Sequence, residues 1–153
     1  MALWTNDAVQ LINPGEDAVF TFNHVPCKRG FIRHRDGTGS FLLAGKVCRN
    51  ACGCFPDSAN YQVDFGANIS IPAGGTVGAI TVAITIDGST IPASTMEVTP
   101  AAVDEYFNVS REINANIWAG CCETVTVRNT SDQVIQMKNA SIDISRPDLA
   151  VTR

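Results

Sequence analysis

Three of the six cysteines lie within seven positions, in the segment CRNACGC, and they have the clearest capacity for chemistry. The six cysteines of the chain are Cys27, Cys48, Cys52, Cys54, Cys121 and Cys122. Structural zinc sites usually combine two C-x₂₋₄-C pairs, or one such pair with two histidines. Cys48 and Cys52 have a permitted spacing, but no second pair accompanies them. His24 or His34 could complete a zinc site only through folding, so we predict no metal and no cofactor.

The same cysteines could act in redox catalysis, stay as buried thiols or form disulfides. Thioredoxin-like catalysis requires a C-x-x-C motif in a βαβ unit, and the sequence has neither. Buried free thiols, which pack as small apolar residues, remain the main alternative. The sequence favours disulfides that form after the protein leaves a reducing compartment. Six cysteines allow fifteen pairings, and the sequence does not choose among them.

Other residues with catalytic potential are few. Five carboxylates could pair as in glycosidases, and these are Asp36, Asp57, Asp104, Glu105 and Glu123. Such pairs also arise by chance in most globular domains. The sequence has no G-x-S-x-G elbow, no H-E-x-x-H motif and no phosphate-binding loop. His34 lies between two arginines, where we expect it to cap a strand end rather than act as a base. We therefore predict that the protein is not an enzyme.

The charge content is low and indicates contact with other subunits rather than with nucleic acid. Charged residues make up 17% of the chain, against a typical value of about 25%. Interface cores are depleted in charge, so part of the surface is expected to be buried in an assembly. The one basic cluster is Lys28, Arg29, Arg33 and Arg35. Nucleic-acid binding needs a larger basic face, so we predict none.

The chain shows no signal for a membrane or for secretion. No stretch reaches 18 apolar residues, so no transmembrane helix and no membrane partner are expected. The first 20 residues lack the charged and apolar regions of a signal peptide. Four N-x-S/T sequons begin at Asn68, Asn108, Asn129 and Asn139. Without a secretion signal, we expect these asparagines to be ordinary turn and strand residues.

Alternating apolar and polar residues predict the β-strands that must position these groups. Every second residue is apolar from Tyr61 to Ile71, and the pattern returns from Ile80 to Ile86. It continues at 124–128 and in a last strand over 134–144, which has an irregularity near Lys138 and Asn139. Shorter candidate strands cover residues 18–22, 30–35, 40–47, 90–98 and 105–117.

Turn residues separate these strands, as in RDGTG, PAGG and NTSD. Helical spacing is absent apart from a single candidate turn at 101–107. Short, evenly spaced strands rich in Thr, Val and Ile are typical of a sandwich, jelly roll or barrel. We therefore predict one all-β domain over residues 1–153, with about eight to ten strands.

Strand parity gives a prediction for the two adjacent cysteines. Val125 and Val127 set the inward side of their strand, and counting back by two places Cys121 inward and Cys122 outward. A bulge at Gly120 would change this parity. We predict that Cys122 forms a disulfide with a cysteine of CRNACGC.

Four segments carry a resemblance to a known family. They are CKRGFIRHRDGTGSFLLAG, YQVDFGANISIPAGGTVGAITVAITIDGSTIP, VTPAAVDEYFNVS and GCCETVTVRNTSDQ. From about Cys27 to Arg146, the chain resembles uncharacterised structural proteins of phages and their Firmicute hosts. That pattern in turn resembles the tumour necrosis factor (TNF) and C1q-like jelly rolls. The resemblance implies a two-sheet antiparallel jelly-roll sandwich of ten strands that forms a homotrimer. It transfers no enzymatic residue.

The leading prediction is a non-enzymatic structural virion protein of a bacteriophage. It would be a trimer that decorates or cements a capsid, or forms part of a fibre, after assembly in the host cytoplasm. Because the chain has no collagen-like Gly-X-Y stalk, a free-standing trimer at the virion surface is favoured. Its partners would be its own copies and virion proteins such as the major capsid protein. Tyr106 and Phe107 are the candidates for the trimer axis.

The alternative prediction is an adhesive module that binds a receptor or a host-surface glycan, on a phage fibre tip or a bacterial or spore surface. Such a module should carry an exposed aromatic side chain near converging polar groups. The two tryptophans of the chain are Trp4 and Trp118. Trp118 ends a predicted strand and is the candidate for the surface aromatic, with a core position as its alternative.

Overall fold

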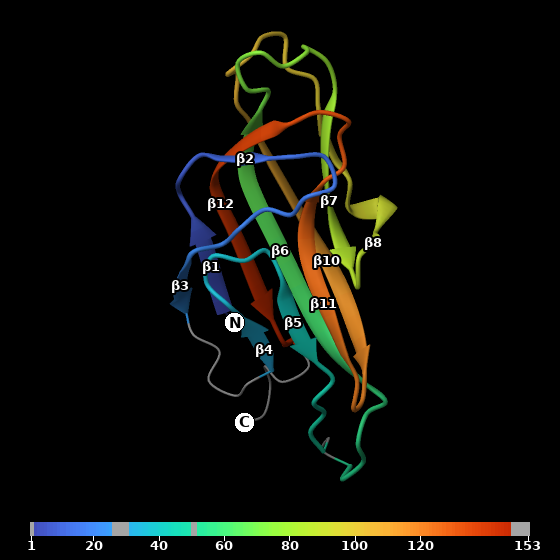
Figure 1. The fold of residues 1–153 in the computed structure, drawn as a ribbon. Coiled ribbons are helices and arrows are strands. Elements are labelled where there is room, and N and C mark those ends of the chain that lie inside the picture. The colour runs from blue at the N-terminus through green and yellow to red at the C-terminus, as the bar shows by residue number, and fades with distance from the viewer. Residues whose placement is uncertain (1, 26–30, 50–51, 148–153) are drawn as a thin grey trace.

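Two antiparallel β-sheets packed face to face make up the fold. The computed structural model describes residues 2–25, 31–49 and 52–147. Its twelve strands are divided into two six-stranded sheets (Figure 1). The helical element that the described ranges contain in full is a 3₁₀ turn at Pro92–Ser94, and no helix there is long and apolar enough to cross a membrane. The predicted all-β, two-layer architecture is confirmed.

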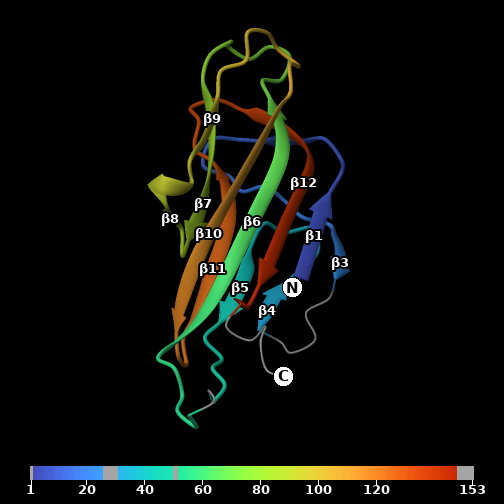
Figure 2. The same cartoon turned by 180° about the vertical axis from the view of Figure 1, so that it is seen from behind.

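Sheet A contains the longest strands and is the front layer in Figure 2. Its order is β10 (Phe107–Trp118), β6 (Ser58–Ser70), β12 (Ile135–Ser145), β1 (Ala2–Asn6) and β3 (Phe22–Val25), with β2 (Gln10–Ile12) paired to β12. The predicted irregularity in the last strand is confirmed. The pairing of β12 with β6 shifts between Lys138 and Ser141, and Asn139 has a φ of 52°.

Sheet B is the front layer in Figure 1 and consists of shorter strands. Its order is β4 (Ile32–His34), β5 (Phe41–Ala44), β11 (Cys122–Asn129), β7 (Ile80–Ile86) and β8 (Ser89–Thr90), with β9 (Met96–Val98) paired to β7. The candidate strand over 90–98 is thus two short strands separated by the 3₁₀ turn. The expectation of a helical turn at 101–107 is wrong, because that segment is a non-helical loop.

The core lies between the sheets and is filled by the inward side of each strand. Side chains alternate along a strand, so odd-numbered residues of β6 from Ala59 to Ile69 are buried against sheet B. Aromatic rings from both layers meet there. Phe20 packs edge-on against Phe41, with 5.4 Å between ring centroids, and against Phe65, with 6.4 Å.

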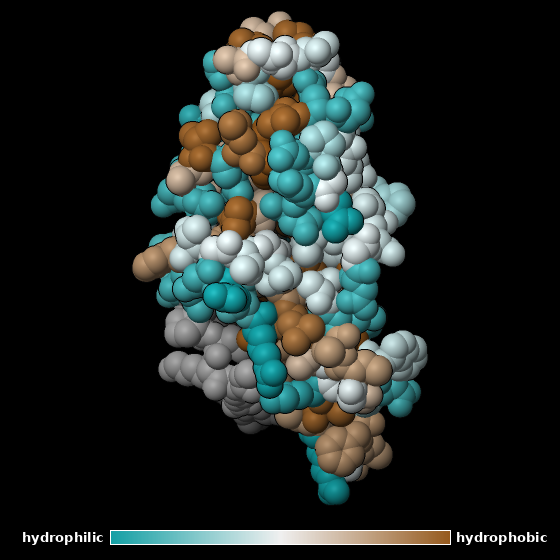
Figure 3. Space-filling model, in the orientation of Figure 1, coloured by the Kyte–Doolittle hydropathy of each residue, from teal (hydrophilic) through white to brown (hydrophobic). Residues whose placement is uncertain are grey.

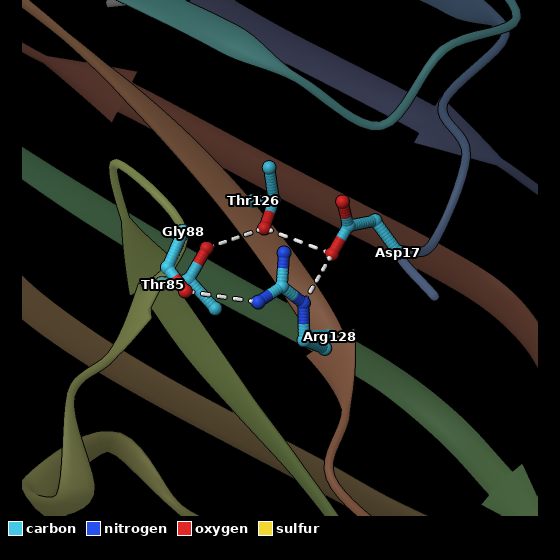
Figure 4. A network of polar contacts seen from close by, with 5 residues as sticks. All are labelled: Asp17, Thr85, Gly88, Thr126 and Arg128. Atoms are coloured by element: carbon cyan, nitrogen blue, oxygen red, sulfur yellow. Dashed lines mark hydrogen bonds and ion pairs between the residues drawn. The ribbon is translucent and has the colours of Figure 1, made fainter. Parts of the chain in front are cut away.

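The chain segment before β3 runs beside the end of β11 and bonds to its backbone without forming a regular strand. It is held by the amide of Ala18, which donates to the carbonyl of Val127 over 2.8 Å. Asp17 accepts hydrogen bonds from Thr126 and Arg128 at 3.0 and 3.1 Å, and Arg128 also donates to the carbonyl of Gly88 (Figure 4). The candidate strand over 18–22 is therefore wrong apart from Phe22, because this segment makes only isolated bridges to sheet B.

The sandwich has two distinct ends, which are visible in Figure 1. The upper end carries β2 and the connections at 71–79 and 99–106. The lower end carries the connection at 45–57 and the turn at 119–121.

A buried aromatic side chain, Tyr61, closes the core near the lower end. The hydroxyl of Tyr61 donates to the carbonyl of Ala44 over 2.6 Å, and the guanidinium of Arg146 covers the Tyr61 ring at 4.8 Å.

Candidate functional site

The outer face of sheet A is polar and largely uncharged, and we call it the amide face. The pairing of β10 with β6 and of β6 with β12 sets opposite one another the side chains that point away from the core. These are Asn108, Ser110, Glu112, Asn114 and Asn116 on β10, Asn60, Gln62, Asp64 and Asn68 on β6, and Lys138, Ser141, Asp143 and Ser145 on β12. Asparagine, glutamine and serine dominate, so this face offers many hydrogen-bond donors and acceptors, and its charged members are three carboxylates and one lysine.

Three carboxylates form one row across the amide face. Glu112 is paired with Asp64 on β6, and Asp64 is paired with Asp143 on β12. Burial raises the pKa of Asp143 above its usual range, the charge of the amino terminus lowers it, and the neighbouring Asp64 raises it further. The Oδ1 atom of Asp143 is buried and has no hydrogen-bond partner among the described residues. The row therefore contains a carboxylate whose ionisation is opposed by its surroundings.

We expect the replacement of Asp143 with Asn to stabilise the fold at neutral pH. A raised pKa in the folded state means that ionised Asp143 costs stability above its unfolded pKa, and this cost is absent when the group is protonated. The variant should thus unfold at higher denaturant concentration than the parent at pH 7. The difference should shrink as the pH falls through the folded pKa towards the ordinary value of 3.8. A difference that is constant over this range would contradict the ionic explanation.

The carboxylates selected from the sequence do not form such a row. Asp104 and Glu105 lie at the upper end, where Asp104 accepts from the side chain of Gln136 at 2.6 Å and Glu105 from the amide of Ala101 at 3.2 Å. Asp57 and Glu123 lie at the lower end, and Asp36 lies in the turn before β5. Sequence analysis missed Glu112, Asp64 and Asp143, because only the strand register brings them together.

Apolar side chains gather at the upper end. Among the described residues, eight large apolar side chains are exposed, and five of them belong to the upper end: Val9, Leu11, Val77, Val103 and Phe107. Strand pairing sets Phe107 and Met137 on either side of Ile69, with Gln10 next to Met137, so β10, β6, β12 and β2 share one level there. Figure 3 shows hydrophobic residues at the surface over this part of the molecule. The upper end is therefore the principal apolar surface.

The two residues predicted for a trimer axis lie at this end but on different sides of sheet A. Tyr106 lies beside Lys138, whose ammonium group is 4.0 Å from the centre of its ring, at the edge of the amide face. Phe107 has the same parity as buried Val109 and is paired with buried Ile69, so it lies at the open end of the core, 37% exposed. Both positions are accessible to a partner at the upper end.

The five described cysteines all belong to the lower end. Cys48, Cys52 and Cys54 lie in the connection at 45–57, and Cys121 and Cys122 lie at the turn into β11. Backbone hydrogen bonds join the two segments: the amide of Gly45 donates to the carbonyl of Cys121 over 2.7 Å, and that of Ala119 donates to Asp57 over 2.9 Å. A side chain at position 45 would lie 2.0 Å from the carbonyl oxygen of Trp118, so this junction requires glycine.

The prediction that Cys121 points inward is wrong. Gly120 has a φ of 82°, and a turn precedes β11, which begins only at Cys122. Parity therefore does not extend back to Cys121, and both Cys121 and Cys122 are exposed thiols. Cys48 is also an exposed thiol, and the structure contains no disulfide between Cys122 and the CRNACGC segment. Cys27 lies outside the described residues.

Trp118 is the last residue of β10 and is 65% exposed. Its neighbour Ile117 is fully buried, so strand alternation places the indole on the outer side of sheet A. Trp118 is paired with Ser58, and the next outward pair along the strands is Asn116 with Asn60. Trp4, in contrast, is 3% exposed and packs against Phe41 in the core. The structure thus sets one aromatic ring beside polar side chains on an open face.

The two histidines belong to different sheets and contribute to the fold. His34 on β4 stacks on Phe41 at 4.1 Å, and its ring nitrogens lie 2.9 Å and 3.2 Å from the carbonyls of Ser40 and Phe20. His24 on β3 contacts the hydroxyl of Thr5 at 2.8 Å.

Within the described ranges, no three His, Cys, Asp or Glu side chains are placed to hold a metal ion. A hollow of about 420 Å³ beside His34 is lined by Arg33, Arg35, Thr38, Ser40, Leu42 and Thr124. Lys28 and Arg29 of the predicted basic cluster lie outside the described residues.

Three of the four sequon asparagines form a chain of side-chain contacts on the amide face. The side chain of Asn108 donates to that of Asn68 over 3.2 Å, and Asn68 donates to Asn139 over 3.3 Å. The fourth, Asn129, is fully buried and donates to the carbonyl of Ile12 over 2.9 Å. These asparagines therefore act as strand and turn residues within the fold.

The fold is similar to those of the globular domains of C1q and TNF proteins. The globular domain of zebrafish complement 1qA protein matches 95% of this chain over 95% of its own length, with a TM-score of 0.56 and 10% identity. The Eiger TNF from S. frugiperda matches 100% of this chain over 94% of its own length, with a TM-score of 0.52 and 12% identity. No protein-family model matches the sequence, and no curated protein sequence does. The likeness establishes a C1q/TNF-like jelly-roll fold.

Proposed function

We propose that this protein is a non-enzymatic structural subunit that acts as a homotrimer on the surface of a bacteriophage particle. It would decorate or cement the capsid, in contact with the major capsid protein, or form part of a fibre. The observation that carries the self-association is the set of apolar side chains at the upper end. Leu11 is 64% exposed and Val9 57% exposed in one protomer, so both would lose contact with water in an assembly.

The low charge of the chain supports the same proposal. Only 17% of residues are charged, and the cores of protein interfaces are depleted in charge. The C1q/TNF-like fold supports it through its architecture, while the phage context is supported by the sequence resemblance. The non-enzymatic role is supported by His34 and Asp104, whose polar atoms are used in contacts that hold the fold.

The first test is the mass of the purified protein by light scattering at micromolar concentration. The expected result is three times the mass of one chain, and the mass of a single chain would contradict self-association. The second test is immunogold labelling of purified phage particles. We expect label at the particle surface, and its absence from intact particles would contradict the virion role while leaving the trimer in place.

A second candidate function is the binding of a host-surface glycan. The observation that favours it is the exposure of Trp118 beside the asparagines of the amide face. This surface lies at the lower end, away from the apolar residues of the upper end, so the two roles are compatible in one protein.

A further inference from the structure

We propose that the lower half of the amide face is a binding platform for neutral glycans. The platform consists of Trp118, Asn116 and Asn114 on β10 with Asn60 and Gln62 on β6. This inference rests on the proposed role as a surface-displayed, non-enzymatic protein, and it names the ligand class of the second candidate function. One protomer carries the whole platform, so binding does not depend on the trimer.

The platform joins the two kinds of group that recognise a sugar. A pyranose ring has an apolar C–H face, which packs against an aromatic ring, and hydroxyl groups around its edge. Trp118 offers the exposed aromatic surface. Asn116 with Asn60, and Asn114 with Gln62, follow it in two successive pairs along the strands. An amide group carries both donors and an acceptor in one plane, which suits the hydroxyl groups of a sugar. Because the Oδ1 atom of Asn60 is buried, Asn116, Asn114 and Gln62 are the acceptors of the platform.

The dimensions fit an oligosaccharide better than a single sugar. Successive outward residues on a strand are about 6.7 Å apart, so the platform extends roughly 13 Å from Trp118 to Asn114. Adjacent strands are about 4.8 Å apart, and Ser145 on β12 continues the row of Asn114 and Gln62. A ligand lying along β10 would therefore stack one ring on Trp118 and place further rings over the amides.

Charge indicates a neutral ligand. The platform contains no lysine or arginine, and the carboxylates of Glu112, Asp64 and Asp143 form its upper border. Nucleic acid and acidic polysaccharides need positive charge, and these carboxylates would repel them. A neutral glycan meets no such repulsion, and its hydroxyls can also donate to the carboxylates at the border.

The backbone holds Trp118 in place before any ligand arrives. Trp118 is fixed by its pairing with Ser58 on one side and by the turn on the other, where the amide of Cys121 donates to the carbonyl of Trp118 over 3.0 Å. Gly120 provides the positive φ that the turn needs. A side chain presented from a rigid element loses less freedom on binding, which favours affinity.

The two tryptophans make the experiment direct. Trp4 is buried and Trp118 is exposed, so quenching of the fluorescence by acrylamide reports mainly on Trp118. Full-length protein is first screened on an array of neutral oligosaccharides built from glucose, mannose, galactose or N-acetylglucosamine. Each oligosaccharide that binds on the array is then titrated in solution, and its binding should reduce the quenching of the Trp118 fluorescence by acrylamide. Trp118→Ala should weaken binding by about tenfold or more, as expected for a central aromatic contact.

Matched variants locate the site. Phe55→Ala removes another apolar side chain of the lower end, 59% exposed but off the strands of sheet A, and should leave affinity unchanged. Asn116→Ala should weaken binding, and circular dichroism should show that every variant is folded. Failure to bind any neutral glycan, or unchanged binding by Trp118→Ala, overturns the platform. Either result leaves the light-scattering mass of the trimer unaffected, so the two proposals fail separately.

Discussion

Replacing Leu11 with Glu is expected to convert the proposed trimer into a folded monomer. Leu11 lies on β2, where it is paired with Gln136 of β12, and it is 64% exposed in the isolated protomer. A glutamate there is solvated in the monomer, so folding should be unaffected. In an assembly the same carboxylate would be buried without a partner in each of the copies, at a cost of several kcal/mol per ion. Light scattering should show a fall in mass at unchanged circular dichroism.

Phe22→Glu is the matched control for this experiment. Phe22 is 59% exposed and also lies on a short strand of sheet A, but that strand is β3, at the edge of the sheet opposite β10. This variant should remain a trimer. Phe107→Glu is a less selective probe, because Phe107 lies on the core-facing side of β10 and its replacement also threatens folding. A trimeric Leu11→Glu variant would exclude β2 from the interface.

The long strands were predictable because one of their faces is buried. On β6, the buried residues alternate without interruption, and the sequence shows the same alternation from Tyr61 to Ile71. The first strand was not predicted, although it lies within sheet A between β12 and β3. Its inward residues include Asn6, and its outward residues include Leu3, so hydrophobicity does not separate the two faces. Alternation detects a strand only where burial divides its faces by polarity.

The candidate sites show a similar limit of sequence analysis, because contacts between distant residues depend on strand pairing. The exposure of Trp118 and the grouping of the cysteines involve residues that the sequence had already singled out. The carboxylate row of Glu112, Asp64 and Asp143 was missed, because its members are separated by 48 and 79 positions along the chain from Asp64 and meet only through strand pairing. The inward placement of Cys121 failed for a local reason. The turn at Gly120 precedes β11, and β11 begins one residue after Cys121.

The proximity of the two cysteine segments leads to a second prediction of large effect. Oxidation with oxidised glutathione is expected to join Cys122 to Cys48. The two thiols lose two protons and two electrons, and one oxidised glutathione becomes two reduced glutathione molecules. Cys122 is paired with Ala44, and Cys48 follows Gly45 by three residues, a tether of at most about 10 Å. The connection can therefore fold back to bring the sulfurs within bonding distance.

Cys48 is the preferred partner because, of the cysteines in CRNACGC, it lies nearest along the chain to Gly45, whose amide donates to the carbonyl of Cys121 over 2.7 Å. Both Cys48 and Cys122 are exposed, so an oxidant can reach the two thiols. A bridge from position 48 to position 122 closes a loop of about 75 residues, and such a constraint on the unfolded chain stabilises a protein by about 4 kcal/mol. The oxidised protein should thus unfold at a clearly higher temperature than the reduced protein.

Peptide mapping without reduction identifies the pair, and two serine variants test its effect on stability. Cys122→Ser should abolish the difference in unfolding temperature between oxidised and reduced protein. Cys121→Ser is the control, since Cys121 lies in the turn before β11 and outside the pairing with β5, and it should retain that difference. A free Cys122 thiol in protein exposed to the oxidant would show that the hydrogen bonds that join Gly45 to Cys121 and to Gly120 fix the two segments too far apart to react. The clustering of the cysteines would then be a packing feature of the lower end.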